Sequence, residues 1–240
     1  HHCEVLVVGG GIAGLQAAKS AAAAGVRVML VEQTAHWGGR APVDGVIIDG
    51  APADEWIKST ISELSSMTNV VIRNRTQGSG IYDHGYALAY ERVADHTPGD
   101  RRPRHRLWRV RCKQIVTATG AIERPLSFAG NDIPGVMLAS AVRDYLVNYG
   151  VSTGDRTIVV TNNDDAYRTA LFLKSAGLDV PAIIDTRAEG GGELMAQATA
   201  AGIRVETGRG IAKVKGSKRV TAVSLCAQVG EGSEIEEIPC

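Results

Sequence analysis

The stretch VLVVGGGIAGLQAAKSAAAAGVRVMLVE, residues 5–32, decides the fold of this chain. Its apolar start, Val5–Val8, has the length and the β-branched content of a buried strand. The alanine-rich segment Ala17–Ala24 then predicts a helix, and Val26–Val31 predicts a second strand. The order of strand, helix and strand indicates one βαβ unit of an α/β fold.

Three glycines between the first strand and the helix hold the spacing G-x-G-x-x-G. Gly9 allows a tight turn, Gly11 allows the backbone to approach a diphosphate, and Gly14 allows the helix to pack closely on the sheet. The free N–H groups and the positive dipole end of the helix favour an anion there. Glu32 ends the second strand, where a carboxylate accepts hydrogen bonds from ribose hydroxyls and repels a 2′-phosphate. The pattern favours NAD, FAD or an ADP-type ligand over NADP, and a glycine-rich structural turn is the alternative.

Two later segments can also approach a bound nucleotide. Gly38 and Gly39 follow the acidic residue closely, and Arg40 either faces the phosphates or lies in solvent. The strand-like segment Ile115–Gly120 ends in A-T-G, which predicts that Thr119 and Gly120 come up to the same site. His36 and Trp37 are more typical of loop packing than of chemistry.

The rest of the first domain reads as a crossover helix followed by strands. We expect a helix at Ala53–Met67, a strand at Asn69–Arg73, and a hairpin of Ala87–Val93 with Leu107–Cys112. Four arginines crowd the hairpin turn, but without interleaved aromatic residues they indicate a solvated turn rather than a nucleic-acid site.

A second unit repeats the βαβ order without the glycines. We place the first dinucleotide-binding domain at residues 1–138 and a degenerate second domain at residues 139–240. The loop T-N-N-D-D-A, residues 161–166, stands where a fingerprint would fall. Asp164 or Asp165 is expected to cap the following helix, and the two carboxylates are expected to repel a diphosphate. Residues 234–240 read as the lead-in to a strand beyond the end of the chain, which suggests a fragment.

Composition excludes several classes of function. The chain has 26 basic and 26 acidic residues, so neither nucleic acid nor an anionic membrane is expected as a partner. No apolar run is long enough to span a bilayer. Its four cysteines form no C-x-x-C pair, which disfavours a zinc site and a redox dithiol and favours a reducing compartment, the cytoplasm. We find no candidate metal ligand set and no candidate catalytic residue.

The order of these motifs resembles the two-dinucleotide-binding-domain flavoproteins related to glutathione and thioredoxin reductase. Within that superfamily the chain is similar to the α subunits of heterotetrameric sarcosine oxidases and to the A subunits of opine oxidases. The segments that carry the resemblance are YDHG (82–85), ATGAIERPLSFAGNDIPGVMLASAVRDYL (118–146) and TNNDDAYRTALFLKSAGL (161–178). They imply a Rossmann-like fold of the thioredoxin reductase type, truncated before the segment that closes the first domain.

The resemblance also implies a function. In the family the α subunit carries NAD in the first dinucleotide site, and the other subunits are β, γ and δ. An amine is oxidised at FAD, electrons pass through FMN to oxygen, and tetrahydrofolate takes up the one-carbon unit. Carried over to this sequence, the NAD contacts fall on a set of residues around the first βαβ unit: Gly9, Gly11, Ala13, Gly14, Glu32, Gln33, Gly39 and Gly78. The alternatives are FAD in the first site of a stand-alone NADH oxidoreductase, and the A component of an opine oxidase.

Overall fold

The computed structural model describes all 240 residues, and its contacts divide the chain into two compact units, His1–Ala121 and Ile122–Cys240. Sequence analysis places the boundary at residue 138 instead. The segment from 122 to 138 packs on the second unit, where the Val214 amide donates to the carbonyl of Ala129 and the Val220 amide to that of Pro134. Phe128 and Ile133 from the same segment join an apolar cluster there. No helix of the chain combines the length and the apolarity that a membrane crossing requires.

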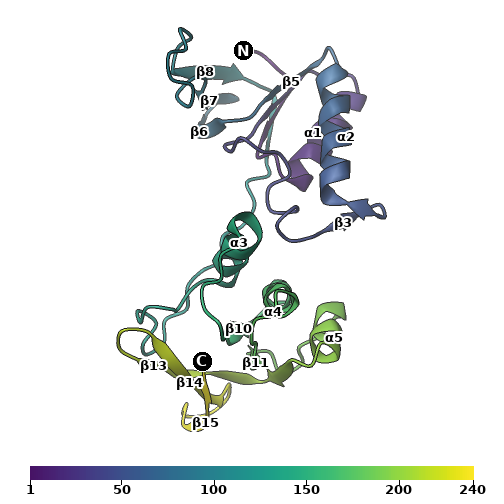
Figure 1. Ribbon diagram of the computed structural model, residues 1–240. Helices are drawn as coiled ribbons and strands as arrows, with labels where there is room; N and C mark the ends of the chain where they lie inside the picture. The colour runs from purple at the N-terminus through teal and green to yellow at the C-terminus, as the bar shows by residue number, and fades with distance from the viewer. The chain divides into compact units, whose positions relative to one another are not determined.

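A parallel sheet with the strand order β5-β2-β1-β9 forms the centre of the first unit. The strands of this sheet are β1 (Val5–Val8), β2 (Val28–Val31), β5 (Val70–Arg73) and β9 (Gln114–Thr117). Helix α1 (Ile12–Ala23) connects β1 to β2, and helix α2 (Ala53–Ser66) precedes β5. A short hairpin, β3 (Ile47–Ile48) with β4 (Ala51–Pro52), precedes α2. Helices α1 and α2 cover one face of the sheet (Figure 1), and Val7 and Leu30 pack there against Leu15 and Leu64.

The other face of the parallel sheet is covered by an antiparallel meander of β6 (Thr76–Tyr82), β7 (Tyr86–Arg92) and β8 (His105–Arg111). Leu6 and Met29 point to this side and pack against Ala87, Ala89 and Val110. Neighbouring residues of β1 therefore enter two different cores, which explains why its sequence is apolar without alternation. The expected hairpin is confirmed by the pairing of β7 with β8, and β6 adds a third strand to it.

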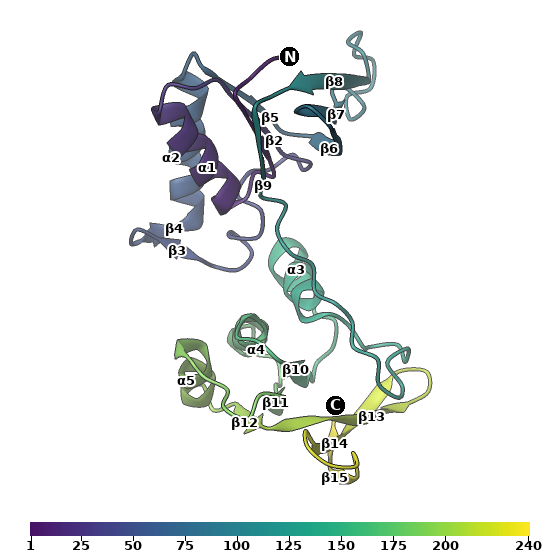
Figure 2. The same cartoon turned by 180° about the vertical axis from the view of Figure 1, so that it is seen from behind.

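The second unit repeats the parallel arrangement with the strand order β10-β11-β12. Its elements are α3 (Ala139–Tyr149), β10 (Val159–Thr161), α4 (Asp165–Ser175), β11 (Ala182–Asp185), α5 (Glu193–Ala200) and β12 (Arg204–Thr207). The buried residues Tyr167, Leu173 and Ile183 form the core between the helices and the strands. Figure 2 shows α4 and α5 on one side of these strands.

A second antiparallel sheet, β13 (Arg209–Gly216), β14 (Val220–Ala227) and β15 (Glu234–Pro239), covers the opposite side. Ile184 of β11 packs there with Val223 and Leu225. The expectation for residues 234–240 is therefore wrong, because they form a strand themselves and pair with β14 from Ala222 to Cys226. Helix α5 was not expected from the sequence, since its eight residues carry little apolar periodicity.

Candidate dinucleotide site

The predicted nucleotide residues meet at one edge of the first unit, where β1, β2 and β9 end. β1 pairs in parallel with both β2 and β9 over all four of its residues. The Ala118 amide extends this pairing, donating to the carbonyl oxygen of Val8 over 2.8 Å. Ligands of open parallel sheets bind at the carboxyl ends of the strands, at a topological switch point. The order β2-β1-β9 makes this edge such a point, because the strands that follow β1 in the chain lie on both of its sides.

The glycine loop packs too tightly to admit side chains. Gly9 has φ +107°, and a Cβ atom there would lie 2.2 Å from the carbonyl oxygen of Ala118. A Cβ atom on Gly14 would lie 1.8 Å from the carbonyl oxygen of Gly9. Both contacts are shorter than any real carbon–oxygen contact, so the turn and the close packing of α1 on the sheet require glycine at these two positions.

The second glycine pair builds a wall beside the first. The Gly38 amide donates to the carbonyl oxygen of Gly10 over 2.8 Å, and Gly11 forms a β-bridge with Gly38. A Cβ atom on Gly39 would lie 3.1 Å from the Cα atom of Gly11. The two loops therefore offer main-chain atoms to a ligand rather than side chains.

The N-terminus of α1 is open for an anion. Its N-cap, Gly11, makes no side-chain capping hydrogen bond, and its first turn, which includes the exposed Ala13, contains no acidic residue. The first N–H groups of a helix lack partners within the helix, and the helix dipole adds positive potential there. This end of α1 therefore fits a diphosphate.

Glu32 closes the site from the end of β2. Its side chain is buried, and the residue is 7% exposed. Oε2 accepts the Gly10 amide and Oε1 accepts the Thr34 amide, each over 2.7 Å. A carboxylate offers about four acceptor positions, so about two remain for hydroxyl donors. That number matches the 2′- and 3′-hydroxyls of one ribose.

The remaining predicted site residues lie around this edge with different environments. The Gln33 carbonyl accepts a hydrogen bond from Arg92 over 3.0 Å. Gly78 of β6 lies so close to β1 that a Cβ atom would come within 2.7 Å of Val8 Cγ1. Thr119 and Gly120 are exposed beyond the end of β9. Arg40 forms an ion pair with Asp44 over 3.2 Å, within its own loop.

Gly10, Thr34 and Trp37 contribute to the site in ways that the sequence analysis did not identify. The Gly10 and Thr34 amides hold the Glu32 carboxylate, and a Cβ atom on Gly10 would lie 2.5 Å from the Trp37 ring and 2.9 Å from Glu32 Cβ. The expectation that Trp37 packs in the loop is confirmed, since it joins the core between the sheet and α1. The fingerprint requires glycine at positions 9 and 11 but not at position 10. The additional glycine between them is the signal that could have identified Gly10.

The equivalent edge of the second unit ends in Asp185, which is fully buried at the end of β11. Four donors reach its carboxylate: the Tyr167 hydroxyl at 2.8 Å, and the amide, Nε and Nη2 of Arg187 at 3.0, 3.0 and 2.7 Å. Burial alone would raise the pKa of Asp185, but the hydrogen bonds from Arg187 and Tyr167 and the charge of Arg187 together outweigh it and hold the pKa below its ordinary value of 3.8. All of about four acceptor positions are used, and none remains for a ribose.

The loop before α4 is also closed, although not in the expected way. Neither Asp164, the N-cap residue, nor Asp165 makes a side-chain capping hydrogen bond, and Asn163 Oδ1 accepts the amide of Asp165, the first residue of α4, over 3.0 Å. Asp164 pairs with Arg187 over 2.7 Å, and Asp165 pairs with the buried Arg143 over 2.6 Å. Arginines therefore neutralise both carboxylates. The expectation that the charge of these two carboxylates keeps a diphosphate away from the loop is wrong.

Comparison with known proteins gives matches across nearly the whole chain. The family model described as pyridine nucleotide-disulphide oxidoreductase matches residues 3–237. The alpha subunit of sarcosine oxidase from Rhizobium meliloti (strain 1021) is 42% identical over 226 residues, covering 93% of this chain and 22% of that protein. Its counterpart from Corynebacterium sp. (strain P-1) is 40% identical, covering 98% of this chain and 25% of that protein. The A subunit of opine oxidase from Agrobacterium tumefaciens (strain Ach5) is 27% identical over 192 residues, covering 76% of this chain and 37% of that protein.

The chain thus spans about a quarter of the length of these sarcosine oxidase subunits. Among solved structures, thioredoxin reductase from T. acidophilum matches 99% of this chain and 74% of its own with a TM-score of 0.69 and 16% identity. L-proline dehydrogenase from P. horikoshii matches 93% of this chain and 39% of its own with a TM-score of 0.63 and 22% identity. These likenesses confirm the expected thioredoxin reductase-like α/β fold.

Proposed function

The chain belongs to the pyridine nucleotide-disulphide oxidoreductase family, and from this premise we propose that it is the NAD-binding region of the α subunit of a sarcosine oxidase-type amine oxidase. Its similarity to the alpha subunits of sarcosine oxidases, at 40–42% identity, supports an oxidoreductase of this kind. The opine oxidase A subunits are more distant at 27% identity, so an opine is the second choice of substrate.

The observation that supports a dinucleotide here is the Glu32 carboxylate, which is fixed by two amides and keeps about two acceptor positions beside the open N-terminus of α1. In the proposed complex Glu32 holds the adenosine ribose, and the amides at the start of α1 hold the diphosphate. Gly9 and Gly14 allow the loop and α1 to pack closely on the sheet, and Gly39 keeps a side chain away from the main chain of Gly11. NAD, when bound, supplies a nicotinamide ring that can exchange a hydride.

The proposal for the whole enzyme follows the family resemblance. Amine oxidation at FAD, electron transfer through FMN to oxygen and capture of the one-carbon unit by tetrahydrofolate are assigned to other subunits or to other parts of the α subunit. No residue of this chain is proposed as a general base, nucleophile or metal ligand. The cytoplasmic location expected from the unpaired cysteines stays a prediction.

A stand-alone FAD enzyme that uses NADH at its second unit is less favoured. Such an enzyme needs a second nucleotide edge, and Asp185 there already accepts four hydrogen bonds. All four cysteines are free thiols and none forms a C-x-x-C pair, so a redox dithiol within this chain is not available either.

The released nucleotide tests the proposal directly. The native complex is purified and denatured, and the released nucleotides are identified and quantified by mass spectrometry against the amount of this chain. We expect one NAD per chain beside the flavins of the complex. FAD without NAD would support the alternative, and the absence of any dinucleotide would contradict a retained dinucleotide.

A further inference from the structure

The outer face of the meander in the first unit carries aromatic residues and arginines without acidic residues. Along β7 the residues alternate, with Ala87 and Ala89 buried and Tyr90 exposed. The register pairs the outward positions of β7 with those of β8, and Tyr82 of β6 lies opposite Tyr86. The outward positions of β7 and β8 are therefore Tyr86, Leu88, Tyr90, Arg92, His105, Leu107, Arg109 and Arg111, and β6 adds Gln77, Gly80 and Tyr82.

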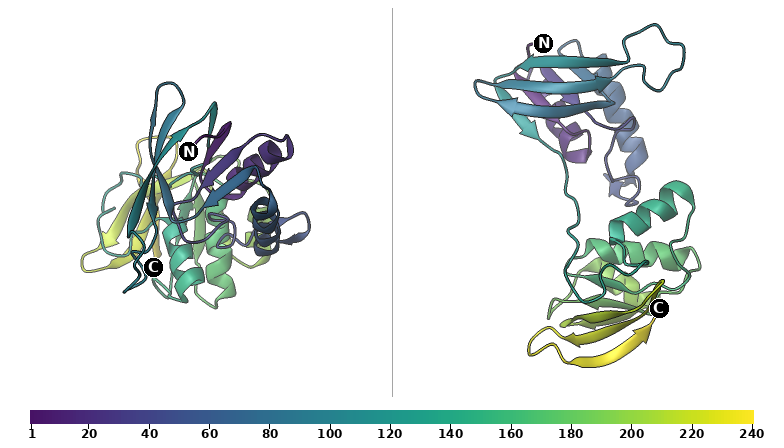
Figure 3. Two further views of the ribbon diagram at one scale, coloured as in Figure 1. Left: turned by 90° about the horizontal axis from the view of Figure 1, so that it is seen from above. Right: turned by 90° about the vertical axis from the view of Figure 1, so that its left-hand side faces the viewer.

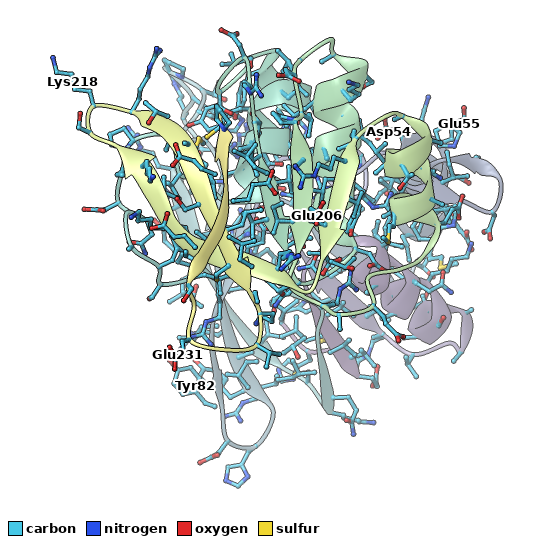
Figure 4. All side chains as sticks on the ribbon, turned by 90° about the horizontal axis from the view of Figure 1, so that it is seen from below. Asp54, Glu55, Tyr82, Glu206, Lys218 and Glu231 are labelled. Atoms are coloured by element: carbon cyan, nitrogen blue, oxygen red, sulfur yellow. The ribbon has the colours of Figure 1, made fainter.

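The exposed side chains of this face are large and contact one another. Leu107 is 57% exposed, Tyr82 is 53% exposed and Tyr90 is 39% exposed. Tyr90 stacks on His105 with ring centroids 5.1 Å apart, and the Arg111 guanidinium lies 4.8 Å from the Tyr86 ring centroid. In the right-hand view of Figure 3 this sheet lies in front of the parallel sheet, and Figure 4 marks Tyr82 among the side chains that project from the chain.

Arg109 and Arg111 on this face form no ion pair, whereas Arg92 at its end lies within electrostatic range of Asp95 and donates to the carbonyl of Gln33. None of the positions of this face is Asp or Glu, and the neighbouring Glu91 points inward, where it accepts hydrogen bonds from Trp108 and Arg106. The antiparallel sheet of the second unit differs, because its cations are paired on the sheet: Lys213 with Glu234, Lys215 with Glu237, and Arg204 of β12 with Glu236. These three cations of the second unit are paired with glutamates, whereas Arg109 and Arg111 of the meander form no ion pair.

We propose that the outer face of the meander binds an acidic surface of another subunit of the oxidase. Tyrosine and arginine are enriched, and lysine and glutamate depleted, at the centres of interfaces between chains. Uncompensated charge of one sign accelerates the diffusional encounter with a partner of opposite charge. Such steering acts between separate chains, since segments of one chain do not have to meet by diffusion of whole molecules. The inference rests on the proposed function in one respect, namely that the protein works in a multi-subunit complex.

Site-specific photo-crosslinking in the native complex tests the proposal. Leu107 is replaced by the photoreactive residue benzoylphenylalanine in the full-length protein. The complex is purified from cells of the source organism and irradiated, and the crosslinked peptides are identified by mass spectrometry. We expect crosslinks to a different subunit, within a segment rich in Asp and Glu. Crosslinks to the same chain, to a second copy of it, or to no protein would overturn the proposal. The same substitution at Val229, which is 87% exposed in the second unit, is the control.

Charge reversal gives an independent measurement. The double variant Arg109→Glu/Arg111→Glu should weaken retention of the other subunits at least about tenfold, with a reduced dependence of the association on salt. Arg101→Glu/Arg104→Glu, in the exposed loop between β7 and β8, should leave retention unchanged. Equal retention in both variants would overturn the proposal. Purification of the unmodified protein without any partner would instead contradict the proposed function, so the two failures are distinguishable.

Discussion

The two βαβ units of this chain share one topology but differ in what their edges offer to a ligand. In the first unit Glu32 accepts two backbone amides, and α1 begins without a side-chain cap. In the second unit Asp185 accepts four donors, and the carboxylates of Asp164 and Asp165 at the start of α4 pair with arginines. The acid at the end of the second strand is present in both units. Its unused acceptor positions, rather than its presence, distinguish a nucleotide edge from a structural one.

The difference also teaches where the stability of each unit comes from. The first unit leaves polar groups at its edge for a ligand, so that binding should stabilise it by mass action. The second unit satisfies the same groups internally through Arg187 and Tyr167, and its stability should be independent of nucleotide. Substitutions at the two edges should therefore affect different quantities.

Gly14→Ala should have the largest effect. A single methyl group 1.8 Å from the Gly9 carbonyl oxygen must push α1 off β1, at a cost of about 3 kcal/mol or more. We expect the purified variant to contain no nucleotide by mass spectrometry and to unfold at lower denaturant concentration. Gly191→Ala, where a Cβ atom meets nothing within 4 Å, is the control and should match the unmodified protein. A variant at position 14 that retains its nucleotide would contradict the packing argument.

Asp185→Ala should lower the free energy of unfolding of the second unit by about 3 kcal/mol, because removing the buried carboxylate leaves the Tyr167 hydroxyl without its acceptor and Arg187 with Asp164 as its remaining partner. Amide hydrogen exchange of β10 and β11 measures the effect. The nucleotide content should not change. Loss of nucleotide on this substitution would indicate that the second unit also takes part in binding.

The same pair makes the second unit sensitive to acid. The folded pKa of Asp185 lies below the ordinary value of 3.8, so its stabilising contribution is present above that pH and is lost as the pH falls through the folded pKa. The difference in stability between the unmodified protein and Asp185→Ala should therefore shrink below pH 3.8. A denaturation series at decreasing pH measures it, and a difference that stays constant would refute the assignment.

Glu32→Ala should weaken nucleotide retention by about 1–3 kcal/mol through the loss of charged hydrogen bonds to the ribose. Isothermal titration of the stripped protein with NAD measures the change. Glu63→Ala on α2, which removes only an exposed ion pair with Lys19, should bind NAD normally. Unchanged affinity on substitution of Glu32 would remove this residue from the site.

Asn163→Ala should have a small effect, about 1 kcal/mol of stability of the second unit, because it removes the hydrogen bond that its Oδ1 accepts from the Asp165 amide. Thermal unfolding measures it. Asp164→Ala removes an exposed ion pair at the same loop and should cost less. A larger loss of stability in Asp164→Ala would contradict this order.

Sequence analysis predicted the first edge better than the second for a physical reason. The glycine spacing and Glu32 are local signals, since each residue acts through its own backbone or position on the strand. The closure of the second edge depends on Arg187, Tyr167 and Arg143, which come from three different elements and meet only in the folded chain. The loop sequence could show that the glycines were absent, but not which cations neutralised Asp164 and Asp165.

Two further features differ from the sequence expectation for a related reason. They are the boundary between the two units and the last strand, β15. Residues 122–138 have no periodicity of their own and take their place from contacts with β13 and β14. β15 alternates weakly, and only its Ile238 is buried. Long-range packing fixes both segments, whereas the end of α3 is fixed locally by Gly150, which adopts the left-handed conformation.

The wall of main-chain atoms that Gly38 and Gly39 build beside the first glycine loop has a consequence for how such proteins evolve. Any glycine codon becomes an alanine codon by one base change, and a Cβ atom on the exposed Gly39 would lie 3.1 Å from the Cα atom of Gly11. A single mutation at Gly39 can therefore alter this crevice while the hydrophobic core survives, so the capacity to hold a coenzyme is more fragile, over generations, than the architecture that displays it.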